Sequence, residues 1–125
     1  MKAWASFNLL LLALLLVVGA GYLGLWTWLG AHPFWGARVA IYGAPMALLL
    51  WILSRWQFDL VRIGAMVLTL GALFAATRGK EAFAASFAEN ALAGQIWFLG
   101  WLIGLGAMVA ALGLSLERIW RRAAP

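Results

Sequence analysis

The feature that most constrains this chain is the absence of Lys, Arg, Asp and Glu between Lys2 and Arg38. A transmembrane helix needs about 20 consecutive, predominantly apolar residues. The whole chain is 66% apolar and only 10% charged, whereas about a quarter of the residues are charged in an ordinary soluble domain. A chain of this composition cannot cover itself with polar surface, so we expect an integral membrane protein.

The apolar runs predict a single all-α transmembrane domain over residues 1–125. We expect four transmembrane helices in a compact antiparallel bundle, over residues 5–29, 33–53, 60–76 and 91–116. The first run is too long for the core of a signal peptide and is expected to stay as a span. Pro45 is expected to kink the second span. Phe83 and Phe87, one turn apart, predict a short interfacial helix over residues 82–90.

Charged residues at the ends of the spans predict the orientation. With four spans, both termini and the hairpin Ser54–Arg62 share one side of the membrane. That side holds six basic residues: Lys2, Arg55, Arg62, Arg118, Arg121 and Arg122. The other side holds three: Arg38, Arg78 and Lys80. Because basic residues favour the cytoplasmic side, we expect both termini in the cytoplasm and the chain in a cell inner membrane. The bias is modest, so a dual topology stays open.

Small residues recur at helical spacing in every predicted span. Such rows let helix backbones approach closely inside a membrane, where close packing holds helices together. The predicted helix-packing residues are Ala20, Gly24, Ala40, Gly43, Ala65, Ala72, Gly100, Gly104 and Ala107. On the last span, bulky residues such as Leu105 and Val109 lie on another face, which we expect to point outward. Trp97, Phe98 and Trp101 are expected to form a docking surface together, in a chain with nine tryptophans.

A few polar residues are candidates for function. Arg38 lies inside the second span, so it either snorkels to the head groups or takes part in function. Asp59 and Arg62 form a possible ion pair, with Asp59 capping the third span. Gln95 is an amide within the fourth span that is available for a bond between helices. The basic C-terminal residues Arg118, Arg121 and Arg122 are expected to anchor the chain to lipid head groups.

The sequence shows no motif of an enzyme, a metal site or a cofactor site. It has no cysteine and one histidine, His32. Its basic residues lie at the ends of apolar runs rather than in a continuous stripe, which favours membrane lipid over nucleic acid as a partner. No carboxylate lies near the middle of a span. We therefore expect a non-catalytic accessory subunit that packs against a larger membrane complex.

Two other hypotheses stay open. The first alternative is a homo-oligomeric transporter or channel for a small solute or ion, with Arg38 and the Pro45 kink lining the path. The second is a lipid-interacting protein that uses the basic C-terminus and the amphipathic segment 82–90.

Overall fold

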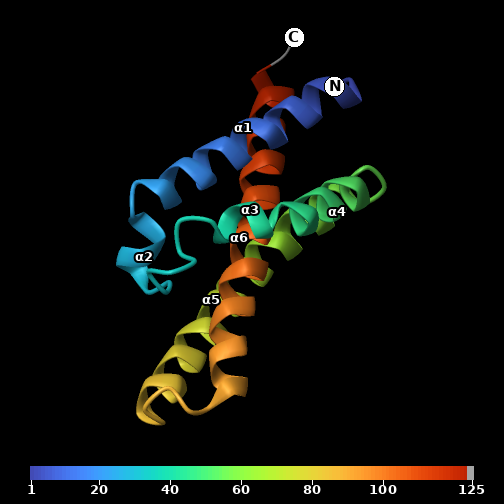
Figure 1. Cartoon of the computed structure of the whole chain (residues 1–125). Coiled ribbons are helices and arrows are strands. Elements are labelled where there is room, and N and C mark those ends of the chain that lie inside the picture. The colour runs from blue at the N-terminus through green and yellow to red at the C-terminus, as the bar shows by residue number, and fades with distance from the viewer. Residues whose placement is uncertain (124–125) are drawn as a thin grey trace.

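A computed structural model of the chain describes residues 1–123; the last two residues of the expected domain lie outside this range. Within it all the regular secondary structure is helical, with turns between the helices and no strand (Figure 1). The helices are α1 (Ala3–Tyr22), α2 (Leu25–Leu29), α3 (Val39–Tyr42), α4 (Ala44–Ser54), α5 (Phe58–Ala85) and α6 (Ala91–Ala123). Three of them, α1, α5 and α6, are long and apolar enough to cross a membrane.

The first predicted span is shorter than expected and is followed by a separate helix. α1 ends at Tyr22, and Gly24 has a φ of 92°, in the left-handed region that favours glycine. The chain then forms α2, and the indole nitrogen Nε1 of Trp26 donates a hydrogen bond to the carbonyl oxygen of Val17 at 2.8 Å. The continuous helix predicted over 5–29 is therefore wrong, because Gly24 lets α2 fold back against α1.

The second predicted span is broken into two helices. Residues 33–38 form turns, so the helix predicted from residue 33 begins only at Val39. Gly43 separates α3 from α4, and Pro45 is the second residue of α4. Proline lacks a backbone N–H, and at this position the N–H would have no partner within the helix. The expected kink at Pro45 is therefore a break that begins at Gly43. The helix α4 has 11 residues, too few to cross a bilayer alone.

The third predicted span continues well beyond residue 76. The helix α5 has 28 residues and extends through the polar segment Thr77–Glu81 to Ala85. Phe87 and Ala88 then have positive φ angles of 57° and 65°, which turns the chain toward α6. A separate interfacial helix over 82–90 was therefore a wrong prediction. A Cβ on Gly79 would lie 2.8 Å from the carbonyl oxygen of Ala93, so glycine allows the two backbones to stay in contact along this extension.

The helix α6 is the centre of the fold. It contacts α1, α3, α4 and α5, and in Figure 1 it runs through the whole molecule, with α5 beside it and α1 crossing its red C-terminal half. Leu105 and Val109 have no exposed surface, so the prediction that they point outward was wrong. The reason is that α6 has neighbours on more than one face: Gly100 and Gly104 meet α5, and the bulky residues pack into the main apolar core.

Most of the small residues chosen from the sequence lie at helix contacts. Ala40, Ala65 and Ala107 are buried, and Ala20 packs against the main core. A Cβ on Gly43 would lie 2.6 Å from the carbonyl oxygen of Leu102 on α6. Corresponding contacts across the α5–α6 interface involve Gly100 with Ala72 and Ala76, and Gly104 with Leu73. Gly24 differs from the rest, because a Cβ there would meet nothing within 4 Å and its role is to end α1.

Candidate functional site: a buried carboxylate between two arginines

The most unusual polar group of the fold is Glu117, near the C-terminal end of α6, whose side chain has no exposed surface. Arg55, at the end of α4, donates from Nη2 to Glu117 Oε1 at 3.0 Å and from Nη1 to Oε2 at 3.4 Å. Arg121, one turn later on α6, pairs with Oε2. The hydroxyl of Ser6 on α1 donates to Oε1. One carboxylate thus joins three helices.

A second layer of hydrogen bonds holds these partners in place. The indole nitrogen of Trp51 donates to Ser6 Oγ at 2.8 Å, and the guanidinium carbon of Arg55 lies 4.9 Å from the centroid of a Trp51 ring. The hydroxyl of Ser54, itself buried, donates to the carbonyl oxygen of Trp51 at 2.5 Å and accepts from Arg55 Nη2 at 2.9 Å. The two α4 side chains that contact Arg55 are therefore held in place, Trp51 by Ser6 of α1 and Ser54 by the backbone of α4.

The same end of the molecule carries a second carboxylate between two arginines. Asp59 Oδ1 lies 2.7 Å from Nη1 of Arg118 on α6 and 3.7 Å from Nη2 of Arg62, one turn further along α5. Asp59 was expected to cap α5, but the N-cap residue is Gln57 and no side-chain capping bond forms there. The expected pairing of Asp59 with Arg62 is present, and Arg118 adds a contact between helices.

The chemistry of the Glu117 cluster is that of a structural ion pair. Its carboxylate oxygens accept bonds from two guanidinium groups and one hydroxyl, so burial is compensated. The guanidinium carbon of Arg121 also lies over the ring of Phe58, 4.3 Å from its centroid. Phe58 is the first residue of α5, so this contact links the cluster to α5 as well. A fully paired carboxylate has no oxygen directed at a substrate. The cluster therefore holds the ends of α1, α4, α5 and α6 together.

Glu117 was not among the residues singled out from the sequence, where the lack of carboxylates near the middle of a span favoured an accessory role. A signal was present: Gly106, Ala110, Gly113 and Glu117 follow one another at helical spacing on a single face of α6. The first three are buried, so the fourth lies on the same buried face. Ser6 extends the buried stripe of α1 in the same way.

The remaining polar candidates lie away from this cluster. Arg38 is exposed and donates from Nη2 to the carbonyl oxygen of Phe34 at 3.0 Å, so it lies against its own turn rather than in the interior. Gln95 is exposed on α6. Of the three expected head-group anchors, Arg118 and Arg121 take part in the ion pairs above, and Arg122 is exposed.

At the other half of the fold, aromatic side chains pack around Trp97. Its ring lies 5.2 Å from His32, 5.6 Å from Trp35 and 5.8 Å from Phe83, measured between centroids. Its Nε1 donates to the carbonyl oxygen of Gly30 at 3.0 Å. Trp97 and Trp101 are only 8% and 5% exposed and Phe98 is partly buried, so the prediction that the three form a docking surface was wrong. They anchor the segment between α2 and α3 onto α6.

Among residues 1–123, no three or more His, Cys, Asp or Glu side chains are placed to hold a metal ion. No protein-family model, no curated protein and no solved structure matches this chain.

Proposed function

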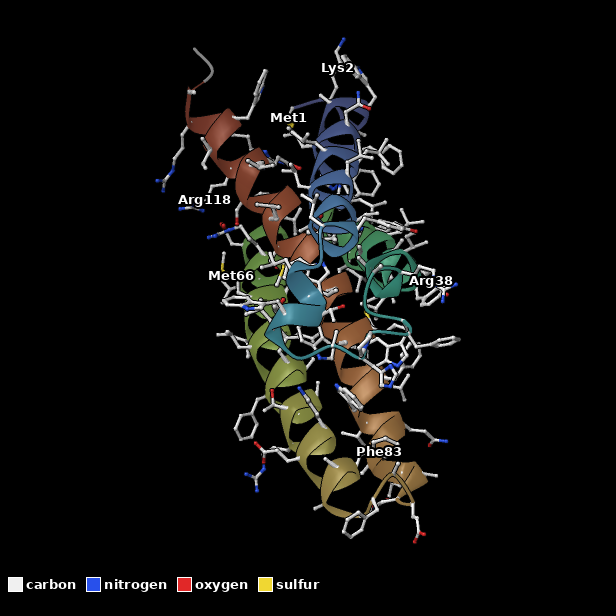
Figure 2. All side chains as sticks on the ribbon, turned by 60° about the vertical axis from the view of Figure 1, so that its left-hand side comes forward. Met1, Lys2, Arg38, Met66, Phe83 and Arg118 are labelled. Atoms are coloured by element: carbon white, nitrogen blue, oxygen red, sulfur yellow. The ribbon has the colours of Figure 1, made fainter. Side chains whose placement is uncertain are left out.

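We propose that this protein is a non-catalytic, multi-pass subunit of a cell inner membrane, which acts by packing against a larger membrane complex. In this proposal α1, the broken pair α3–α4, α5 and α6 make four crossings. Both termini lie in the cytoplasm, because the end of the fold that carries them also carries the two arginine–carboxylate clusters. Figure 2 places Lys2 and Arg118 toward this end and Phe83 at the opposite end.

The observation that carries the proposal is the uncovered side of α5. This helix packs against α6 and, less extensively, against α4. Its remaining circumference is exposed, including the large apolar side chains of Leu60, Val67 and Phe74. The same side contains Gly64 and Gly71, two turns apart, and a Cβ at either would meet nothing within 4 Å.

Comparison with the other glycines shows why this matters. Glycine in a helix costs about 1 kcal/mol relative to alanine, so its presence needs a reason. Gly43, Gly79 and Gly100 have that reason, since each allows close contact with another helix of the chain. Gly64 and Gly71 have no such contact within the described residues. A helix of another protein, lying across this side of α5, would give them one.

The proposal is tested by replacing both Gly64 and Gly71 with leucine in the tagged full-length chain. After purification in mild detergent, native mass spectrometry of the wild type should show a foreign membrane protein at fixed stoichiometry. The double variant should fold normally and lose this partner, because leucine fills the contact. Gly19→Leu is the matched control: a Cβ on Gly19 of α1 also meets nothing within 4 Å, so this variant should keep the partner.

Other outcomes would decide against the proposal. A stable monomer in the wild type, or equal loss of the partner in the Gly19 control, contradicts a docking role for α5. A pure homo-oligomer would favour the alternative, a small transporter or channel built from several copies. That alternative gains nothing from Arg38, which is exposed and bonded to Phe34 rather than directed at a path.

A further inference from the structure

An open, apolar groove of about 330 Å³ runs along the seam between α5 and α6. One stripe of each helix forms its walls: Met66, Thr69 and Leu70 from α5, and Met108, Ala111, Leu112 and Ser115 from α6. From Met108 to Ser115 the helix rises about 10 Å, enough for part of an acyl chain. The two methionines are flexible side chains that adapt their shape to a ligand.

One end of this groove is polar. The helices α5 and α6 are antiparallel, and Asp59 pairs with Arg118 across them at 2.7 Å. Arg62 lies one turn after Asp59, and Ser115 lies one turn before Arg118, so Arg62 and Ser115 are level with each other. Figure 2 shows Met66 and Arg118 on the same side of the molecule, with Arg118 nearer the end that holds Met1 and Lys2.

Two hydrogen-bond donors at this end are buried and unpaired. Arg62 Nε and Ser115 Oγ have no hydrogen-bond partner among the residues that the structure describes. Thr69, in the wall of the same groove, satisfies its hydroxyl by donating to the carbonyl oxygen of Ala65 at 2.8 Å. Both atoms are enclosed by the surrounding side chains, so an anion at this end of the groove approaches the part of the Arg62 side chain that stays exposed, which is 15% of it.

The charge at this end identifies the ligand as an anion. Arg62 and Arg118 share one carboxylate, Asp59, so the three side chains together carry one net positive charge. The Arg62 contact is the longer of the two, at 3.7 Å, which leaves its guanidinium available for a second anion. A guanidinium group suits the oxygens of a phosphate group.

We propose that the α5–α6 groove binds one anionic phospholipid of the phosphatidylglycerol type. One of its two acyl chains lies between Met66, Leu70 and Met108, and its phosphate pairs with the exposed part of the Arg62 guanidinium. The net negative charge of the lipid balances the extra arginine. This site is separate from the uncovered side of α5 proposed to bind a partner protein, since Gly64 and Met66 are two residues apart and point about 200° from each other around the helix.

The test uses the purified full-length chain in mild detergent, titrated with phosphatidylglycerol or phosphatidylcholine and followed by native mass spectrometry. One phosphatidylglycerol should bind, with a preference of about tenfold or more over phosphatidylcholine. Arg62→Gln should reduce this affinity by about tenfold, equivalent to one charge-assisted hydrogen bond. Arg122→Gln removes one positive charge at the same end but outside the groove, and should bind as the wild type does.

A second pair of variants tests the apolar part without altering charge or core. Leu70 and Val67 are 72% and 64% exposed, and only Leu70 lines the groove. Leu70→Trp should weaken lipid binding, whereas Val67→Trp should not. Equal losses in Arg62→Gln and Arg122→Gln, or displacement of the lipid by excess inorganic phosphate, would overturn the proposal. A dimer that Leu70→Trp disrupts would also overturn it, because the groove would then belong to a second copy.

Discussion

Replacing Glu117 with glutamine tests whether the buried cluster holds the helix ends together. The substitution keeps the shape of the side chain but removes the charge shared by Arg55 and Arg121. Breaking a fully buried ion pair costs about 3–5 kcal/mol, because the remaining charge has no partner. Here the arginine side chains keep 23% and 42% exposure, so they can turn toward head groups or water. We therefore expect the free energy of unfolding to fall by a smaller amount, about 2–3 kcal/mol.

The measurement is reversible unfolding of the purified protein in mixed micelles, by titration with a denaturing detergent and detection of helicity by circular dichroism. Glu89→Gln is the control: this carboxylate is exposed, and its loss should leave the free energy of unfolding unchanged. Arg55→Gln should be at least as harmful as Glu117→Gln, since it leaves the buried carboxylate with Arg121 as its one cationic partner in the cluster.

The double variant Glu117→Gln with Arg55→Gln gives the sharpest result. Once the carboxylate is gone, loss of Arg55 should cost little more, so the two effects should fall short of additivity by about 1 kcal/mol or more. Additive effects, or a Glu117→Gln protein as stable as the Glu89→Gln control, would refute the reasoning that this cluster stabilises the fold.

Two further predictions concern the packing of α6. Gly43→Leu should lower the free energy of unfolding by about 3 kcal/mol in the same assay, because the new leucine side chain would meet the backbone of Leu102 and Gly106. A variant as stable as the wild type would show that α4 can move away from α6. Leu105→Ala should lower the free energy of unfolding by about 2–5 kcal/mol, because this leucine has no exposed surface. Leu99 on the same helix is 48% exposed, so Leu99→Ala should lower it far less. The reversed order would contradict the central position of α6.

The sequence by itself determined the helical, membrane-compatible character of the chain and most of its close helix contacts. Apolar runs of sufficient length specify helices, since a helix pairs its own backbone groups in an apolar medium. Small residues at helical spacing, such as Gly43 and Gly100, mark faces where backbones approach, and the structure places both against a neighbouring helix. These properties depend on local spacing alone, so a single sequence contains them.

Only the tertiary structure decided which faces are covered and where helices end. Gly24 ends α1, whereas Gly64 and Gly71 stay helical although a Cβ at any of the three would meet nothing within 4 Å, so a glycine in the sequence does not by itself decide where a helix ends. Leu105 is buried because α6 has neighbours on two sides. The periodicity of α6 alone does not indicate how many of its faces are covered. Helical spacing places Glu117 on the small-residue face of α6, and it becomes a buried link between helices because Ser6 and Arg55 arrive from distant parts of the chain.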